Sequence, residues 1–413
     1  MEVISSKDRQ ILQDLAKKQF MFSQSEQMQQ LRQEWTDHND CHGKRPMITV
    51  ELGTFAQDVI PDLLKCEGEL ARSIEWDLHS NIVNHELFHD DSIVKDYIPI
   101  DRFTKFVPFD IPIQIDHVDN SVGHHFVEVI HDLQQDFHLL KPSTFSVDTQ
   151  KREQTLALYH DLFDGIIPVK VAGSALYAVP TQDIVHIMSM ENMMFSMYDY
   201  PDEFHQMMSQ LTDDYLAYFQ FIADNGLLLP TTQDEHLAQG SYSFTTELPN
   251  QSVWETRPFT TKDVWGFMDS QETSGISPDM YEEFIFPYYQ KICNCYGLLS
   301  YGCCEAVDPI WENCLSKLKN LRKISISPWC NEEFMGEQLQ GKRIVYQRKP
   351  SPSFLGVGST LEEDKLREHI RKTVHAAKGC TLEFSQRDVY TLGNTYQKVA
   401  RYVEILREEC ENF

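Results

Sequence analysis

From about residue 165 onward, short apolar segments alternate with amphipathic segments of helical length. Buried strands are predicted at 166–173, 226–230, 297–302, 321–328, 343–348 and 380–384. Helices are predicted at 183–197, 201–225, 280–295, 308–317, 361–377 and 394–409. Alternation of this kind is typical of βαβ units and a parallel sheet. We therefore predict an α/β protein, in which about seven or eight such units would close into a (β/α)8 TIM barrel.

The first 150 residues do not follow this rhythm. They are polar at the start, with helical spacing over 10–35, and a strand-like alternation appears at 109–116. We predict residues 1–150 as a helical and mixed N-terminal extension and residues 151–413 as the barrel. Two roles for the extension stay open, namely a cap over the barrel mouth and a source of the first barrel strand or strands.

Charge and composition exclude several classes of protein. Lys plus Arg is 36 and Asp plus Glu is 63, so the formal net charge is −27. This balance argues against nucleic-acid binding and against attraction to an anionic membrane. No stretch of 18 apolar residues predicts a membrane span, and the first residues lack a signal-peptide pattern. We expect a cytoplasmic enzyme with a small-molecule substrate, and a homodimer stays open.

Candidate site residues follow from the barrel geometry. The site of such a barrel lies at the C-terminal ends of its strands. Residues that follow the predicted strands and carry reactive, charged or aromatic side chains are His236, Cys303, Cys304, Glu305, Trp329, Arg348, Lys349 and Arg387.

The Cys303-Cys304-Glu305 run is the most informative of these signals. Neighbouring residues of a strand face opposite ways, so Cys303 and Glu305 share a face. Zinc accepts thiolate, imidazole and carboxylate ligands, and Cys380 is the candidate for a second thiolate. The alternative is that Cys303 and Cys304 pack beside a turn.

Four runs of sequence resemble a known family. They are Ile276–Phe284, Pro287-Tyr288, Tyr301–Glu305 and Asn320–Trp329. These runs resemble the uroporphyrinogen decarboxylase superfamily, in particular its branch of uncharacterised decarboxylase-like bacterial proteins. The resemblance covers about residues 155–405. It implies a (β/α)8 barrel and either of two chemistries, cofactor-free decarboxylation of a tetrapyrrole or methyl transfer between a corrinoid and a thiol.

The sequence departs from both patterns. The decarboxylases carry an N-terminal Arg-Gln-Ala-Gly-Arg motif that is absent here. The methyltransferases bind zinc through an H-x-C motif and a later Cys, which resemble Tyr301-Gly302-Cys303 and Cys380. Tyr301 stands in place of the His, so Glu305 or His236 would have to supply the missing ligand.

The leading prediction is a corrinoid-linked methyltransferase that moves a methyl group between a small molecule or thiol and a corrinoid carried by a partner protein. Zinc would be held by Cys303 and Cys380. The predicted catalytic residues are Tyr301, His236 and Glu305, and the predicted substrate-binding residues are Trp329, Arg348, Lys349 and Arg387. The alternatives are a uroporphyrinogen-type decarboxylase that uses Arg348, Arg387 and Asp116, and a barrel that binds a tetrapyrrole or corrinoid without catalysis.

Overall fold

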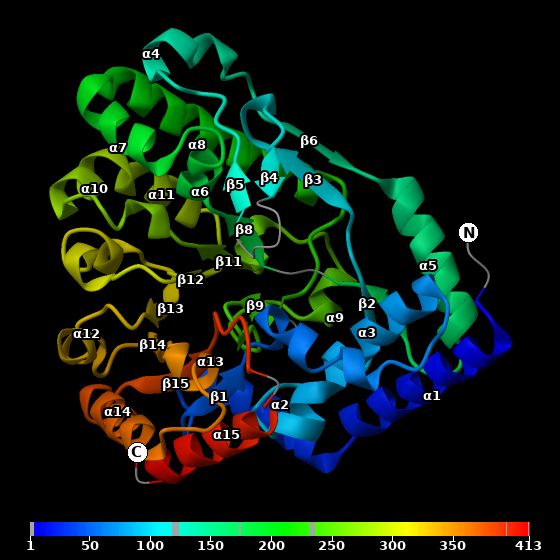
Figure 1. Cartoon of the computed structure of the whole chain (residues 1–413). Helices are drawn as coiled ribbons and strands as arrows, with labels where there is room; N and C mark the ends of the chain where they lie inside the picture. Colours follow the sequence, from blue (N-terminus) through cyan, green and yellow to red (C-terminus); the bar gives the residue numbers. More distant parts are fainter. Residues whose placement is uncertain (1–3, 118–123, 173–174, 232–235, 394, 412) are drawn as a thin grey trace.

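A seven-stranded parallel sheet is the centre of the fold (Figure 1). The computed structural model describes residues 4–117, 124–172, 175–231, 236–393, 395–411 and 413. The strands, in spatial order, are β1 (Met47–Val50), β15 (Thr381–Gln386), β14 (Val345–Arg348), β13 (Leu321–Ile326), β12 (Leu298–Tyr301), β11 (Trp265–Met268) and β8 (Leu176–Ala178). Every neighbouring pair in this sheet is parallel. The predicted α/β class with a parallel sheet is therefore confirmed.

Closure of the sheet into a TIM barrel is not confirmed. Within the described ranges no strand ladder joins β8 to β1. Two predicted barrel strands lie elsewhere or do not form. The segment predicted at 166–173 gives β7 (Val169–Val171), which pairs with β2 (Ile98–Ile100) outside the main sheet; residue 173 lies outside the described part. The segment at 226–230 forms no strand, although its leucines at 227 and 228 are buried.

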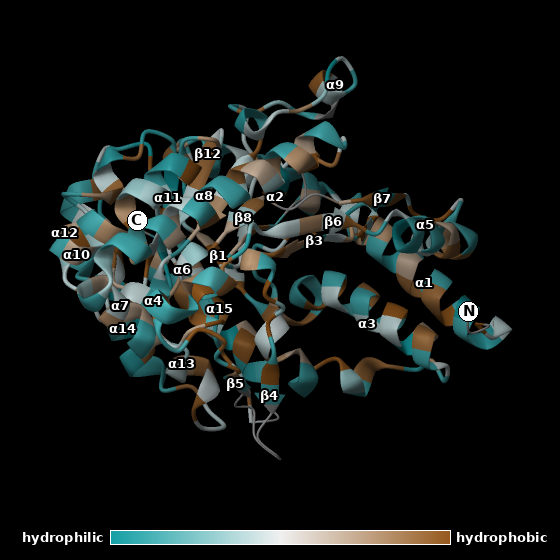
Figure 2. Ribbon diagram, turned by 90° about the horizontal axis from the view of Figure 1, so that it is seen from above, coloured by the Kyte–Doolittle hydropathy of each residue, from teal (hydrophilic) through white to brown (hydrophobic). Residues whose placement is uncertain are grey.

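Helices cover one face of the sheet (Figure 1). They are α6 (Pro180–Val185), α7 (Met190–Asp199), α8 (Pro201–Asp224), α10 (Pro278–Phe284), α11 (Phe286–Cys293), α12 (Glu332–Leu339), α13 (Ser353–Gly356), α14 (Glu363–Ala376) and α15 (Gln397–Cys410). Their outward surfaces are largely hydrophilic, whereas hydrophobic residues concentrate in the strands beneath them (Figure 2). The helix predicted at 183–197 is divided into α6 and α7. The one predicted at 308–317 forms only the two 3-10 turns η9 (Asp308–Ile310) and η10 (Leu315–Lys317).

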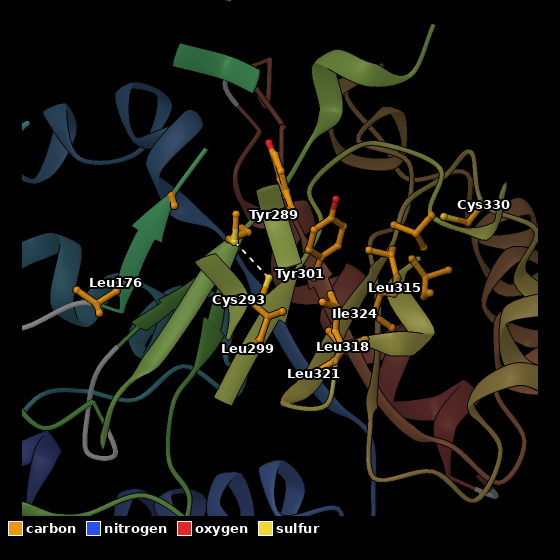
Figure 3. Packing of buried hydrophobic residues seen from close by; sticks show 14 of the residues in the cluster. Leu176, Tyr289, Cys293, Leu299, Tyr301, Leu315, Leu318, Leu321, Ile324 and Cys330 are labelled. Atoms are coloured by element: carbon orange, nitrogen blue, oxygen red, sulfur yellow. Dashed lines mark hydrogen bonds between the residues drawn. The ribbon is translucent and has the colours of Figure 1, made fainter. Parts of the chain in front are cut away.

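The hydrophobic core lies between the sheet and these helices. Leu299, Tyr301 and Ile324 belong to one cluster with Tyr289 and Cys293 of α11 (Figure 3). All five residues are fully buried or nearly so. Burying this much apolar surface is the main stabilising contribution to the fold.

The opposite face of the sheet, called the inner face below, is buried but polar. Lys323 Nζ donates to Glu383 Oε2 at 2.9 Å, and both side chains are inaccessible to solvent. A short hairpin, β9 (His236–Ala238) and β10 (Ser241–Tyr242), covers this face. Its turn accepts a 3.2 Å hydrogen bond from Gln347 Nε2 at the Gln239 carbonyl oxygen. The inner face is therefore held by specific polar contacts rather than by apolar packing.

The N-terminal segment forms helices and small strand pairs. Its longer helices are α1 (Ser6–Ser23), α2 (Glu26–Asn39), α3 (Glu69–Val83) and α5 (Thr149–Phe163). Shorter elements are β3 (Thr104–Val107), β4 (Ile115–His117), β5 (His124–Phe126), α4 (Leu133–Asp136) and β6 (Thr144–Val147). In Figure 1, α1, α3 and α5 lie across the molecule from the helices that cover the sheet. β1 nevertheless belongs to the central sheet, so this segment supplies one of its strands. None of the described helices is both long and apolar enough to cross a membrane.

Candidate functional site

The C-terminal edge of the sheet brings four reactive or charged side chains together. Cys303 follows β12, Asp269 follows β11, Lys349 follows β14 and Arg387 follows β15. Arg387 Nη1 lies 3.5 Å from Cys303 Sγ, and Lys349 Nζ lies 3.0 Å from the Cys303 carbonyl oxygen. Because the strands are parallel, their carboxyl ends meet at one edge, which is where α/β proteins place their sites.

The turn that carries Cys303 is held in place from several sides. Glu305 accepts the backbone N–H of Cys303 at 2.8 Å and that of Ser270 at 3.0 Å, with one carboxylate oxygen each. Ser325 Oγ donates to the Cys303 carbonyl oxygen at 2.7 Å. Gly302 has a φ of +99°, a conformation that glycine adopts without strain. This turn ends the strand alternation and directs Cys303 away from the core that holds Tyr301.

Two thiols lie side by side on this turn. The sulfur atoms of Cys303 and Cys304 are 3.5 Å apart, and Cys304 Sγ is 3.1 Å from Asp388 Oδ2. The hydrogen bond from Cys304 lowers the pKa of the Cys303 thiol, and the positive charges of Lys349 and Arg387 lower it further, against the effect of burial. The hydrogen bond to Cys303, burial and the neighbouring Asp388 carboxylate raise the pKa of Cys304. Cys303 is therefore the thiol of the pair that ionises first, while Cys304 donates its proton to one of its two acceptors at a time.

A buried carboxyl group stands beside the thiolate. Asp269 is only 2% exposed, and its Oδ1 has no hydrogen-bond partner among the described residues. Burial, together with the charges of Glu305 and Cys303, raises the pKa of Asp269. Asp269 is thus held protonated, which limits the negative charge of the site. The sequence did not indicate this residue, because the strand that precedes it, β11, was not among the predicted strands.

Several of the predicted residues lie away from this group. Arg348 faces the helices, where it donates to Glu332 Oε1 at 2.9 Å and to the Ser327 carbonyl oxygen at 2.6 Å. Tyr301 also faces the helices, and its hydroxyl lies 2.6 Å from that of Tyr281. Trp329 follows β13 and is 77% exposed. Lys349, Arg387 and Glu305 are the predicted polar residues that the structure brings to Cys303.

The structure does not bring Cys303 and Cys380 together. Cys380 precedes β15, whereas Cys303 follows β12, so the two thiols lie at opposite edges of a parallel sheet. Cys380 Sγ instead lies 3.5 Å from the Gly336 carbonyl oxygen, and burial raises its pKa to about 11. In the described part of the chain, no group of three or more His, Cys, Asp and Glu side chains is placed to hold a metal ion.

A cavity of about 420 Å³ adjoins the site. Among the residues that line it are Glu51, His236 and Gln239. Two of these reach the charged groups of the site. Glu51 Oε2 lies 3.1 Å from Arg387 Nε, and Gln239 Oε1 accepts from Lys349 Nζ at 2.7 Å. His236 lines this cavity and lies away from Cys303. The volume suits a small-molecule ligand.

Comparison with known proteins gives a likeness of fold. No protein-family model matches the chain, and no curated protein matches its sequence. Among solved structures, the fold is similar to that of a methyltransferase from Methanosarcina mazei, with a TM-score of 0.52 and 12% sequence identity. The match covers 90% of this chain and 97% of that one. At this identity, the likeness concerns the fold rather than the reaction.

Proposed function

We propose that the chain is a corrinoid-linked methyltransferase, which moves a methyl group from a corrinoid carried by a partner protein to a small thiol. The observation that carries this proposal is the Cys303 thiolate, which the fold places at the C-terminal edge of the sheet beside Arg387. Arg387 in turn contacts Glu51, which lines the neighbouring cavity. The fold likeness to a methyltransferase is consistent with it. A thiol is a poor nucleophile until it loses its proton, so the reaction needs a nearby base.

Cys303 serves as that base. Its sulfur takes the proton from the bound thiol, whose own sulfur then attacks the methyl group. The methyl–cobalt bond breaks with both electrons left on cobalt, and the product is a methyl thioether. The lowered pKa of Cys303 favours its deprotonated form near neutral pH, which suits general base catalysis there. The Cys303 proton then passes to water, which restores the thiolate.

Positive charges beside Cys303 stabilise its thiolate, which is the basic form. Arg387 contacts the sulfur directly, and Lys349 holds the backbone of the turn through the Cys303 carbonyl oxygen. Asp269 stays neutral, so it adds no further negative charge beside the Cys303 thiolate. Glu305 acts as a positioning residue, since both its oxygens accept backbone N–H groups.

Zinc does not fit this site. Its second predicted thiolate, Cys380, is at the opposite edge of the sheet. Neither oxygen of Glu305 is unoccupied, and the guanidinium of Arg387 stands 3.5 Å from Cys303 Sγ, where it would repel a divalent cation. The proposed reaction therefore assigns no step to zinc.

The decarboxylase alternative lacks its predicted contacts. A polycarboxylate substrate needs several guanidinium groups that point toward it. Arg348 faces the helices instead, and Asp116 lies exposed on β4, in a two-stranded pair outside the central sheet. Formation of coproporphyrinogen from uroporphyrinogen by the purified protein would reinstate this alternative.

Methyl transfer from methylcobalamin to small thiols tests the proposal. The reaction is followed without oxygen by the visible spectrum of the corrinoid, with wild type beside Cys303→Ala and Cys380→Ala. We expect turnover in wild type and Cys380→Ala, and a loss of about 100-fold or more at neutral pH in Cys303→Ala. Equal rates in wild type and Cys303→Ala, with the fold intact by circular dichroism, would remove Cys303 from the reaction.

A further inference from the structure

A second cavity, called the basic cavity below, lies at the N-terminal edge of the sheet and has a volume of about 500 Å³. Its lining residues include Lys44, Arg45, Arg371, His375 and Lys378. We propose that the basic cavity binds a small molecule that carries phosphate groups and an apolar portion. This proposal is independent of the methyl-transfer site.

The strand topology brings the two walls of the basic cavity together. Residues 43–45 lead into β1, and residues 374–382 form the end of α14 and the start of β15. β1 and β15 are parallel neighbours, with Met47 opposite Glu383. Segments that precede parallel neighbours meet at the same edge of the sheet. In Figure 1, α14 lies at this edge, near the C-terminal end of the chain.

The charge of the lining is the opposite of that of the whole chain. Five lining residues are basic and none is acidic, although Asp plus Glu outnumbers Lys plus Arg by 63 to 36 overall. The two arginines are neutralised nearby: Arg45 pairs with Glu34 and Asp91, and Arg371 pairs with Glu409.

The remaining basic residues are not neutralised. Lys44, His375 and Lys378 have no ion pair among the described residues. The dipole of α14 favours cations at its C-terminal end, which accounts for Lys378. It does not account for Lys44, which comes from a different segment and faces the same cavity. Unpaired lysines from two walls are an arrangement suited to an anion with more than one negative charge.

Part of the remaining lining is apolar. Val374, Cys380 and Leu382 form a wall beside the cations. The thiol of Cys380 stays neutral, because burial raises its pKa to about 11. A volume of about 500 Å³ accommodates a ligand of nucleotide size. A ligand with phosphates and an aromatic ring would satisfy both kinds of wall.

The basic cavity is remote from Cys303. β15 runs from one edge of the sheet to the other over six residues, which is roughly 20 Å at the usual rise of a strand. Binding here can therefore be measured separately from methyl transfer.

Calorimetric titration of the full chain with ADP and with inorganic pyrophosphate tests the proposal. We expect ADP to bind, and Lys44→Glu and Lys378→Glu to weaken its binding at least tenfold each. Lys372→Glu is the matched control, because this residue lies on α14 but does not line the basic cavity. It carries the same change of charge and should leave ADP binding within about twofold of wild type. Pyrophosphate should bind more weakly than ADP, since it lacks an apolar portion.

Acetylation of Lys44 locates the bound ligand, because this lysine is exposed and lines the basic cavity. ADP should slow the acetylation of Lys44 in wild type, as measured by peptide mass spectrometry, and should not do so in Lys378→Glu. Absence of binding by both probes would overturn the proposal. So would equal weakening by Lys372→Glu and Lys378→Glu, or ADP binding that leaves Lys44 unprotected.

Discussion

Replacement of Arg387 by Met tests the electrostatic origin of the Cys303 thiolate. Arg387 Nη1 is 3.5 Å from Cys303 Sγ, and the arginine side chain is mostly buried. At an effective dielectric constant of about 20, two unit charges at about 4 Å attract by roughly 4 kcal/mol. Glu51 and Asp388 lie 3.1 Å and 3.4 Å from the same guanidinium, and they offset part of this attraction. We therefore expect Arg387→Met to raise the pKa of Cys303 by about 1 to 2 units.

The pH dependence of alkylation measures this shift. Wild type and Arg387→Met are treated with iodoacetamide over a range of pH, and fragment ions distinguish Cys303 from Cys304. The midpoint for Cys303 should move to higher pH in the variant, because the thiolate is the reactive form. Arg371→Met, at the other edge of the sheet, removes the same charge and should leave the midpoint unchanged. Identical midpoints in wild type and Arg387→Met would refute the reasoning.

Three further predictions concern stability, each measured by urea denaturation. Lys323→Met should lower the free energy of unfolding by about 3–5 kcal/mol, because it leaves Glu383 buried without its cation. The double variant Lys323→Met with Glu383→Leu should recover most of this loss, and no recovery would contradict the pairing of the two residues. Burial raises the pKa of Asp183 to about 7, so its protonated form is favoured in the folded state and wild type should lose stability as pH rises from about 4 to about 7. Asp183→Asn should lack this part of the pH dependence. If the free energy of unfolding changed with pH in the same way in both proteins, Asp183 would not be its source. Gly336→Ala should lower the free energy of unfolding by about 1–3 kcal/mol, because the new Cβ would lie 1.8 Å from the Ala376 carbonyl oxygen. An unchanged stability would show that α12 and α14 can separate.

The sequence predicted the strands of the second half better than those of the first. Strands β12 to β15 lie where the apolar segments placed them. The segment at 166–173 is likewise short and apolar. It forms β7, which pairs with β2 outside the sheet, because pairing partners depend on distant segments that local periodicity does not reveal.

Alternation explains which site residues could be predicted. Arg348 and Lys349 are adjacent, so on a strand they face opposite ways. The structure directs Lys349 to the inner face and Arg348 to the helices. The same rule would have separated them in the sequence. Tyr301 and Cys303 should share a face by this rule, yet the positive φ of Gly302 separates them. In the sequence, Gly302 between them is the feature that indicates this turn.

Long-range geometry decided the rest of the site. Cys380 resembles a second metal ligand in sequence order, but its place before β15 puts it at the edge opposite to Cys303. Asp269 was missed because the strand before it, β11, was not predicted. What distinguishes Asp269 is burial with no hydrogen-bond partner for Oδ1 among the described residues, which only the folded arrangement creates.

The most direct test of the central claim is the pH–rate profile of methyl transfer from methylcobalamin to a small thiol, in wild type and in Cys303→Ala. If Cys303 is the base, the wild-type rate rises through the lowered pKa of Cys303 and then levels off. The Cys303→Ala rate should be low at neutral pH and should recover only as the substrate thiol ionises in its own right, near its ordinary pKa of about 8.5. Profiles of the same shape and height in both proteins would contradict the account.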